Sequence, residues 1–200
     1  IEDGRLGYRA TVGGGTSILK YMQERVRPGF VGRIYAVING TLNFVLDGVA
    51  SGRSLGEMTY EARKLGYAEP GAENALDVVN EEANGDIPRK STIFFDIFAH
   101  SLGENNFITN TLVQPASHRI TQEMLNELVR QAGNRRYIVS IKRRDSNNSE
   151  DVIGGYRLEI GEWLLQGGFR PISDDPLYQR FLPRGVDNAI LIAEGVNETG

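Results

Sequence analysis

The chain has 200 residues, of which 40% are hydrophobic and 24% charged, an ordinary composition for a globular protein with one or two domains. Its formal net charge of −4 leaves no basic surplus to neutralise phosphates, so nucleic acid is not an expected partner. The absence of cysteine excludes disulfides, a thiolate nucleophile and a cysteine-bound metal, and fits a cytoplasmic enzyme. No apolar run approaches the roughly 18 residues of a membrane span. Because Ile1 is not a natural start, we expect a preceding segment.

The first predicted elements are a helix, a strand and a second helix. After the glycine-rich turn VGGGTS, hydrophobic spacing predicts a helix over 18–26, capped by Thr16 or Ser17. The β-branched and aromatic run 33–38 predicts a strand, and NGT at 39–41 is the turn that leads from it into a further helix. We therefore expect a strand-to-helix junction at this triplet.

A third helix has clear sequence signals at both ends. Ser54 and Glu57 form a capping box, and Gly66 stands where the helix should stop. Its predicted buried stripe consists of Leu55, Met58, Ala62 and Leu65. An acidic loop is expected to follow, up to a helix over 91–103.

The last third of the chain changes from helical to strand periodicity. Thr121 is expected to cap a helix that ends near Gly133 and directs Met124, Leu125, Leu128 and Val129 inward. Strands are predicted at 135–143, 156–165 and 188–196, with a polar hairpin loop at 144–151 and an irregular connection at 167–185. Helices first and strands last predict an α+β fold rather than alternating βαβ units.

Two turns invite a ligand-binding interpretation. VGGGTS exposes backbone amides at a helix start but lacks the lysine of a phosphate-binding loop, so phosphate binding and a plain tight turn stay open. NGT at 39–41 matches a glycosylation sequon, but a strand-end turn that contacts a ligand and a simple Asx turn are the alternatives that fit its position.

Other charged groups are given structural roles. His100 and His118 have no partner at metal-ligand spacing, so no zinc site is expected. The basic residues near the first strand of the last third are expected to form a solvated edge that discourages strand pairing. They are Arg135, Arg136, Lys142, Arg143 and Arg144.

The sequence Asp86-Ile-Pro-Arg-Lys90 has a more specific pattern. A proline in a first helical turn would allow Asp86 to be the helix N-cap, and Lys90 would then lie about one turn further along. One interpretation is an ordinary cap with a surface lysine. The other is a lysine held among carboxylates, which passes a proton to or from a small polar substrate.

These motifs together resemble a known enzyme family. ATVGGGTSIL, INGTLNFVL, EARKLGYAEP and D-x-x-x-K, in this order, are similar to the catalytic region of homoserine dehydrogenase, from about Ala10 to the helix after Lys90. That family interconverts L-homoserine and L-aspartate 4-semialdehyde with NAD or NADP, in threonine and methionine biosynthesis. The resemblance implies that residues 1–200 form a substrate-binding, catalytic and dimerisation domain, with a mixed β-sheet and helices on one face. The Rossmann domain is absent from this chain, and a homodimer is implied.

The resemblance also implies roles for individual residues. Lys90 corresponds to the proton-transferring lysine of the family, and Glu69 and Asp86 to carboxylates that hold the amino-acid substrate. Thr41, Tyr67 and Asp77 correspond to the pocket wall, although the stretch from Glu69 to Asp86 is longer than is usual in the family. A sodium ion bound by main-chain carbonyls would map to Arg9, Val12, Gly14 and Thr16.

Two other classes remain as alternatives. The first is a non-catalytic amino-acid-binding or dimerisation module with the same fold, and the second is a phosphate-binding hydrolase. The presence of Lys90 with Glu69 and Asp86 argues against the first, and the missing phosphate-loop lysine argues against the second. A dehydrogenase that forms an acyl phosphate would need a thiolate, which this chain lacks.

Overall fold

The central element of the fold is a six-stranded antiparallel sheet with the order β2-β4-β5-β3-β1-β6. The computed structural model describes residues 18, 20, 21, 31–68, 71–101, 117–143, 152–160, 162–174 and 176–194. The strands are β1 (Val31–Val37), β2 (Ser117–His118), β3 (Arg135–Arg143), β4 (Ile153–Ile160), β5 (Trp163–Pro171) and β6 (Ala189–Glu194). The helices are α2 (Gly40–Ala50), α3 (Leu55–Lys64), α4 (Ala75–Glu81), α5 (Ile87–Ser101), α6 (Gln122–Arg130) and α7 (Pro176–Phe181), with a π-helical segment (Glu82–Asp86) and a 3₁₀ turn (Ile172–Asp174).

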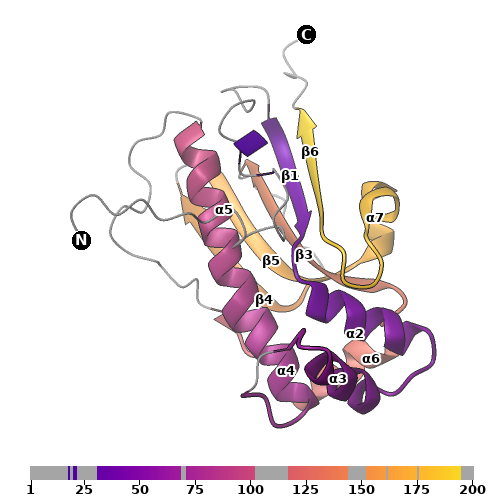
Figure 1. The fold of residues 1–200 in the computed structure, drawn as a ribbon. Coiled ribbons are helices and arrows are strands. Elements are labelled where there is room, and N and C mark those ends of the chain that lie inside the picture. The colour runs from indigo at the N-terminus through magenta and orange to yellow at the C-terminus, as the bar shows by residue number, and fades with distance from the viewer. Residues whose placement is uncertain are drawn as a thin grey trace.

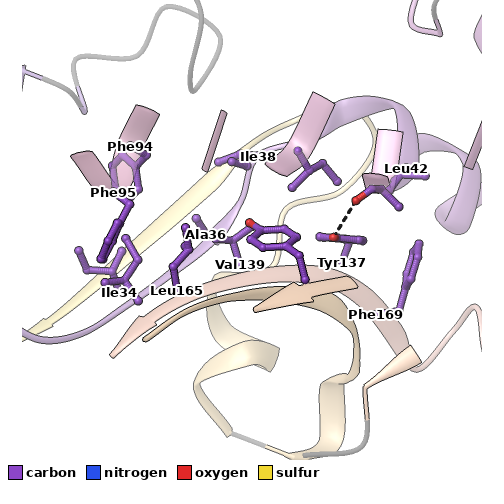
Figure 2. Packing of buried hydrophobic residues seen from close by; sticks show 14 of the residues in the cluster. Ile34, Ala36, Ile38, Leu42, Phe94, Phe95, Tyr137, Val139, Leu165 and Phe169 are labelled. Atoms are coloured by element: carbon purple, nitrogen blue, oxygen red, sulfur yellow. Dashed lines mark hydrogen bonds between the residues drawn. The ribbon is translucent and has the colours of Figure 1, made fainter. Parts of the chain in front are cut away.

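The main core lies between one face of this sheet and the long helix α5 (Figure 1). Phe94, Phe95 and Phe98 of α5 are at most 1% exposed. Phe94 and Phe95 face the sheet that carries Val139 and Leu165 (Figure 2). The Phe98 ring meets Trp163 edge to face, with 4.9 Å between ring centroids. Burial of these aromatic rings is a large part of what fixes α5 to the sheet.

A smaller cluster covers the opposite face of the sheet. There the ring of Tyr178 in α7 packs edge to face on Tyr35 of β1 at 5.1 Å, beside Val37 and Ile138. The α+β architecture is therefore confirmed, with two refinements. Every described strand pair is antiparallel, so the sheet is not mixed, and α7 lies on the face away from α5.

Residues Ala75–Ser101 form one continuous helical path through the π-helical segment. The backbone N–H of Ile87 donates to the carbonyl of Glu82, five residues earlier. Pro88 explains this register, because a proline lacks an N–H and its ring collides with the carbonyl four residues before it in an α-helix. The prediction that Asp86 caps a new helix is therefore wrong, and the supposed acidic loop contains α4.

The local helix signals are confirmed. Ser54 and Glu57 form the capping box of α3 and Thr121 caps α6, as predicted, and Asn39 in the turn at 39–41 caps α2. At the end of α3, Gly66 has a φ of +76°. The backbone N–H of Gly66 donates to the carbonyl of Arg63, and the backbone N–H of Tyr67 donates to the carbonyl of Ala62. This pair of hydrogen bonds is the Schellman motif. Leu65 and Val129, however, are 50% and 36% exposed rather than buried.

The strand predictions in the last third are only partly correct. The segment 135–143 is β3 as expected, but 156–165 is divided between β4 and β5, which pair with each other as a hairpin. Because β5 lies between β3 and β4 in the sheet, these two strands do not pair, and the prediction of a hairpin between them is wrong. The connection expected to be irregular contains the rest of β5 and α7. The helical spacing predicted at 18–26 falls mostly outside the described residues.

Three basic residues of β3 are buried, so the prediction of a solvated edge is wrong for them, whereas Arg143 at the end of the strand is exposed and Arg144 lies outside the described residues. Arg135, Arg136 and Lys142 are 3%, 8% and 9% exposed, because β3 is a central strand between β5 and β1. The guanidinium of Arg135 donates to the carbonyl of Phe169 at 3.1 Å, and Arg136 forms an ion pair with Asp47 of α2. These hydrogen bonds offset the desolvation cost of the two charges.

Within the described residues, no helix is both long and apolar enough to cross a membrane.

The hydroxyl of Tyr137 links the sheet to the π-helical segment. It donates to the carbonyl of Ala83 at 3.0 Å, and Tyr137 is 2% exposed (Figure 2). We expect Tyr137→Phe to lower the free energy of unfolding by about 1 kcal/mol, because a buried carbonyl loses its donor. Urea unfolding measures the change, and Tyr60→Phe is the matched control because Tyr60 is 66% exposed. Equal effects of the two substitutions would contradict the assignment.

Candidate active site

A cavity of about 320 Å³ lies where three distant segments of the chain meet, with Val186 from a fourth segment, the one before β6. The start of α2 contributes one side, the turn after α3 another, and the π-helical segment with the first turn of α5 a third. The residues that line it are Asn39, Gly40, Thr41, Gly66, Tyr67, Glu82, Asp86, Lys90 and Val186. The site therefore requires the tertiary fold and is not a local motif.

The side chain of Asn39 joins two of these segments. Its Oδ1 accepts the backbone N–H of Leu42 at 2.8 Å, which caps α2. Because Oδ1 is engaged there, Nδ2 points toward the carboxyl groups and donates to Glu82 Oε2 at 2.5 Å and to Asp86 Oδ2 at 3.1 Å. A helix cap at the end of β1 thus fixes the carboxyl pair on the neighbouring helix.

Three ionisable residues at intervals of four form a stripe along the helix on that side of the cavity: Glu82, Asp86 and Lys90. The Lys90 Nζ lies 2.6 Å from Asp86 Oδ2, and both side chains are about one third exposed. An acid four residues before a lysine is a favourable helical orientation, although solvent at this exposure screens the pair.

Glu82 is the most buried carboxyl group of the cavity, with 4% of its surface exposed. Burial raises the pKa of its carboxyl from 4.5 to about 7, and the hydrogen bond from Asn39 opposes that rise. The negative charge of Asp86 raises the pKa further, while the ammonium of Lys90 lowers it. Glu82 therefore changes its charge near neutral pH.

Thr41 and Tyr67 connect the start of α2 to the end of α3. The hydroxyl of Thr41 donates to the carbonyl of Tyr67 at 2.6 Å. The Tyr67 ring is 40% exposed and packs edge to face on Phe44 at 5.3 Å. The Schellman turn at Gly66 reverses the chain and brings the tyrosine to the cavity.

The structure brings together four of the residues singled out in the sequence: Lys90, Asp86, Thr41 and Tyr67. Asp77 is not among the lining residues. It lies in the first turn of α4, where its N–H donates to the cap Asn74 and its carboxylate suits the helix dipole. Glu69 and the proposed sodium ligands Arg9, Val12, Gly14 and Thr16 lie outside the described residues.

The sequence interpretation missed Glu82 and Val186 as cavity residues, whereas Asn39 belongs to the NGT triplet for which a ligand contact was one alternative. The four-residue spacing of Glu82, Asp86 and Lys90 was a usable signal, but only for a helix that continues through Gly85 and Pro88. Gly85 favoured a loop and Pro88 the start of a new helix, and this predicted break hid the stripe. No local pattern could place Val186, because it comes from the segment before β6.

Within the same described ranges, no group of three or more histidine, aspartate or glutamate side chains could hold a metal ion. The sodium site stays a prediction, because its proposed ligands are main-chain carbonyls of residues outside the described ranges.

A family model for homoserine dehydrogenase matches residues 18–158. The chain belongs to the homoserine dehydrogenase family. It is 33% identical over 89 residues to a homoserine dehydrogenase of Neisseria gonorrhoeae, a match that covers 44% of this chain and 20% of that protein. It is 31% identical over 93 residues to one of Pseudomonas aeruginosa, covering 46% and 21%. The matched part is thus about a fifth of these relatives.

Solved structures share the fold across nearly the whole chain. A proposed homoserine dehydrogenase from Archaeoglobus fulgidus has a TM-score of 0.58 and 22% identity, covering 96% of this chain and 50% of that one. A hyperthermophilic archaeal homoserine dehydrogenase mutant in complex with NADPH has a TM-score of 0.55 and 20% identity, covering 96% and 46%. The chain therefore corresponds to about half of these solved homoserine dehydrogenase chains.

The shifted pKa of Glu82 predicts a pH-dependent stability. Because the folded-state pKa lies above the unfolded value, the folded chain binds the extra proton between pH 4.5 and about 7, and stability falls as pH rises through that window. The slope should approach 1.4 kcal/mol per pH unit. Glu82→Gln should remove this pH dependence, so that the stability of the variant rises relative to that of the wild type as pH rises.

Urea unfolding of the wild type and Glu82→Gln from pH 4.5 to 8 tests this expectation. Glu81→Gln is the matched control, because Glu81 is the neighbouring glutamate and is exposed. Parallel stability curves for wild type and Glu82→Gln would rule out a titrating Glu82.

Proposed function

We propose that this chain is the substrate-binding and catalytic part of an enzyme that interconverts L-homoserine and L-aspartate 4-semialdehyde with NAD or NADP. The observation that carries the proposal is one lysine ammonium beside two carboxyl groups in a single cavity: Lys90, Asp86 and Glu82. Membership of the family supports the reaction class.

The charges of the cavity suit an amino acid. Lys90 neutralises one carboxylate, so an ionised Glu82 leaves one negative charge that the ammonium group of a substrate would balance. The amides of Gly40 and Thr41 belong to the first turn of α2, whose N–H groups have no acceptor within a helix. That end of the cavity suits the substrate carboxylate. A zwitterion thus has a complementary surface for each of its charges.

Lys90 is the proposed proton-transferring group. Reduction of an aldehyde leaves an alkoxide, to which a nearby ammonium can donate a proton while it stabilises the developing charge. Asp86, 2.6 Å from the Lys90 Nζ, holds the ammonium at the cavity wall. In the oxidative direction, the neutral amine would accept the proton of the homoserine hydroxyl.

A bound nicotinamide would supply or accept the hydride. The cavity, at about 320 Å³, is at the lower limit for ligand pockets and suits an amino acid rather than a dinucleotide. The chain also contains no G-x-G-x-x-G run. We therefore propose that a Rossmann domain outside this chain holds the dinucleotide and presents its nicotinamide at the cavity mouth. A homodimer, a cytoplasmic location and a role in threonine and methionine biosynthesis belong to the same proposal.

Replacing Lys90 tests the proton-transfer step. In an enzyme that joins this chain to a nucleotide-binding domain, Lys90→Ala should lower kcat for homoserine oxidation by about 10²–10⁴-fold, the usual contribution of a general acid–base. Lys64→Ala is the matched control, since Lys64 is an exposed lysine of α3. If Lys90→Ala keeps more than about a tenth of wild-type turnover with its circular dichroism unchanged, the proton-transfer assignment is wrong.

Replacing Asp86 tests the charge balance. Asp86→Asn should raise the KM for homoserine by about 10–100-fold, because Lys90 would then balance Glu82 and the cavity would lose the negative charge that attracts the substrate ammonium. It should also lower kcat, since the Lys90 ammonium loses its partner. Asp77→Asn is a suitable control, because Asp77 is not a lining residue. Equal kinetics for the two variants would contradict the role of Asp86.

A further inference from the structure

One face of α2 carries the segment 184–188 that leads into β6. Gly40, Asn43 and Asp47 follow one another at intervals of three and four, which places them on the same side of the helix. Each of them contacts this segment, so a single helix face supports a part of the chain about 140 residues away.

The three contacts are specific. Asn43 Nδ2 donates to the carbonyl of Asp187 at 3.0 Å, and the N–H of Gly185 donates to Asp47 Oδ2 at 2.7 Å. At Gly40, an added Cβ would lie 2.7 Å from the carbonyl oxygen of Val186. Only glycine permits that approach without displacing the segment.

The supporting side chains are themselves held. Asn43 is 1% exposed, and Asp47 forms an ion pair with Arg136 of β3, which is 8% exposed. Gly185 adopts a φ of +61°, a conformation that favours glycine. The position of Val186 is therefore determined from both sides, by the helix and by the turn.

Val186 is the one aliphatic side chain among the described residues that line the cavity. The other lining side chains are polar or aromatic, and two lining residues are glycines. An amino acid with a terminal hydroxyl group carries charged or polar groups at its ends and methylene groups between them. The charged groups of the cavity suit the ends, and Val186 offers an aliphatic side chain to the methylene groups between them.

We propose that Val186 is a specificity-determining residue that packs against the methylene groups of the substrate and limits its chain length. Asn43 and Asp47 are the positioning residues that hold it there. The inference rests on the proposed function, because it takes an amino acid with a terminal hydroxyl as the ligand.

The test compares ligands that differ by one methylene group, L-homoserine and L-2-amino-5-hydroxypentanoate. Saturation-transfer NMR on this chain measures both dissociation constants, including weak ones. Val186→Ala should lower the ratio of the longer ligand's Kd to that of homoserine by about fourfold or more, the worth of one buried methylene. Val186→Leu should raise the same ratio. Val129→Ala on α6, an exposed valine outside the lining set, should leave it unchanged.

A second variant separates positioning from folding. Asn43→Asp has nearly the same shape but cannot donate to the carbonyl of Asp187, so it should shift the ligand ratio in the same direction as Val186→Ala. A purely structural role would lower the urea midpoint and leave the ratio at its wild-type value.

The two levels of the proposal fail differently. If the wild-type chain binds neither ligand, the proposed function is overturned and this inference with it. If homoserine binds and the ratio stays constant in both Val186 variants, the inference alone is overturned.

Discussion

The side-chain amide of Asn39 is the interaction on which the site depends. Its oxygen caps α2 and its nitrogen holds the carboxyl groups of Glu82 and Asp86, so one planar group fixes the strand end, the next helix and a distant helix at once. The orientation of the amide follows from the cap, because an unpaired first-turn N–H at Leu42 would be costly in a buried position. An aspartate at this position could cap the helix, but it would repel the two acids. Asparagine meets both demands.

The π-helical segment is the second constraint, and it arises from Pro88. The extra residue in that turn lets the helical path continue from α4 into α5 through a proline that would otherwise end or kink it. The carbonyl of Ala83, inside the segment, accepts the hydroxyl of Tyr137 from the sheet. The irregular turn is thereby anchored to the core directly beside the acidic stripe. Such single π-turns are common at functional sites because they re-aim side chains without breaking the helix.

The parts of this structure that follow from short-range chemistry could be predicted from the sequence. The caps at Ser54 and Thr121 and the helix stop at Gly66 each depend on a few neighbouring residues, as does the strand Arg135–Arg143. The errors concern partners far apart in the chain. No residue near Arg136 in the sequence indicates that Asp47 is its partner, so this buried, paired arginine was predicted to be solvated. The hairpin of β4 and β5 looked like one strand because only two residues separate the two strands. Within the site, Lys90 and Asp86 were found through a motif, whereas Glu82 needed the helix to be known first.

The walls of the cavity have a common support in α2. Its N-terminal cap holds the acidic stripe, Thr41 holds the carbonyl of Tyr67, and its Gly40–Asn43–Asp47 face holds the segment that carries Val186. The helix is fixed to the core by Leu42 and Leu46, so each wall refers to the same rigid element. A site whose walls share one support keeps its dimensions even when its surface loops vary, because displacing one wall requires breaking a buried hydrogen bond. This geometry explains how the cavity could keep fixed distances between the groups that bind the two charges of a small zwitterion and the aliphatic side chain that contacts its methylene groups. The element that must be rigid is therefore α2, whereas Lys90, the residue proposed to transfer the proton, lies on α5.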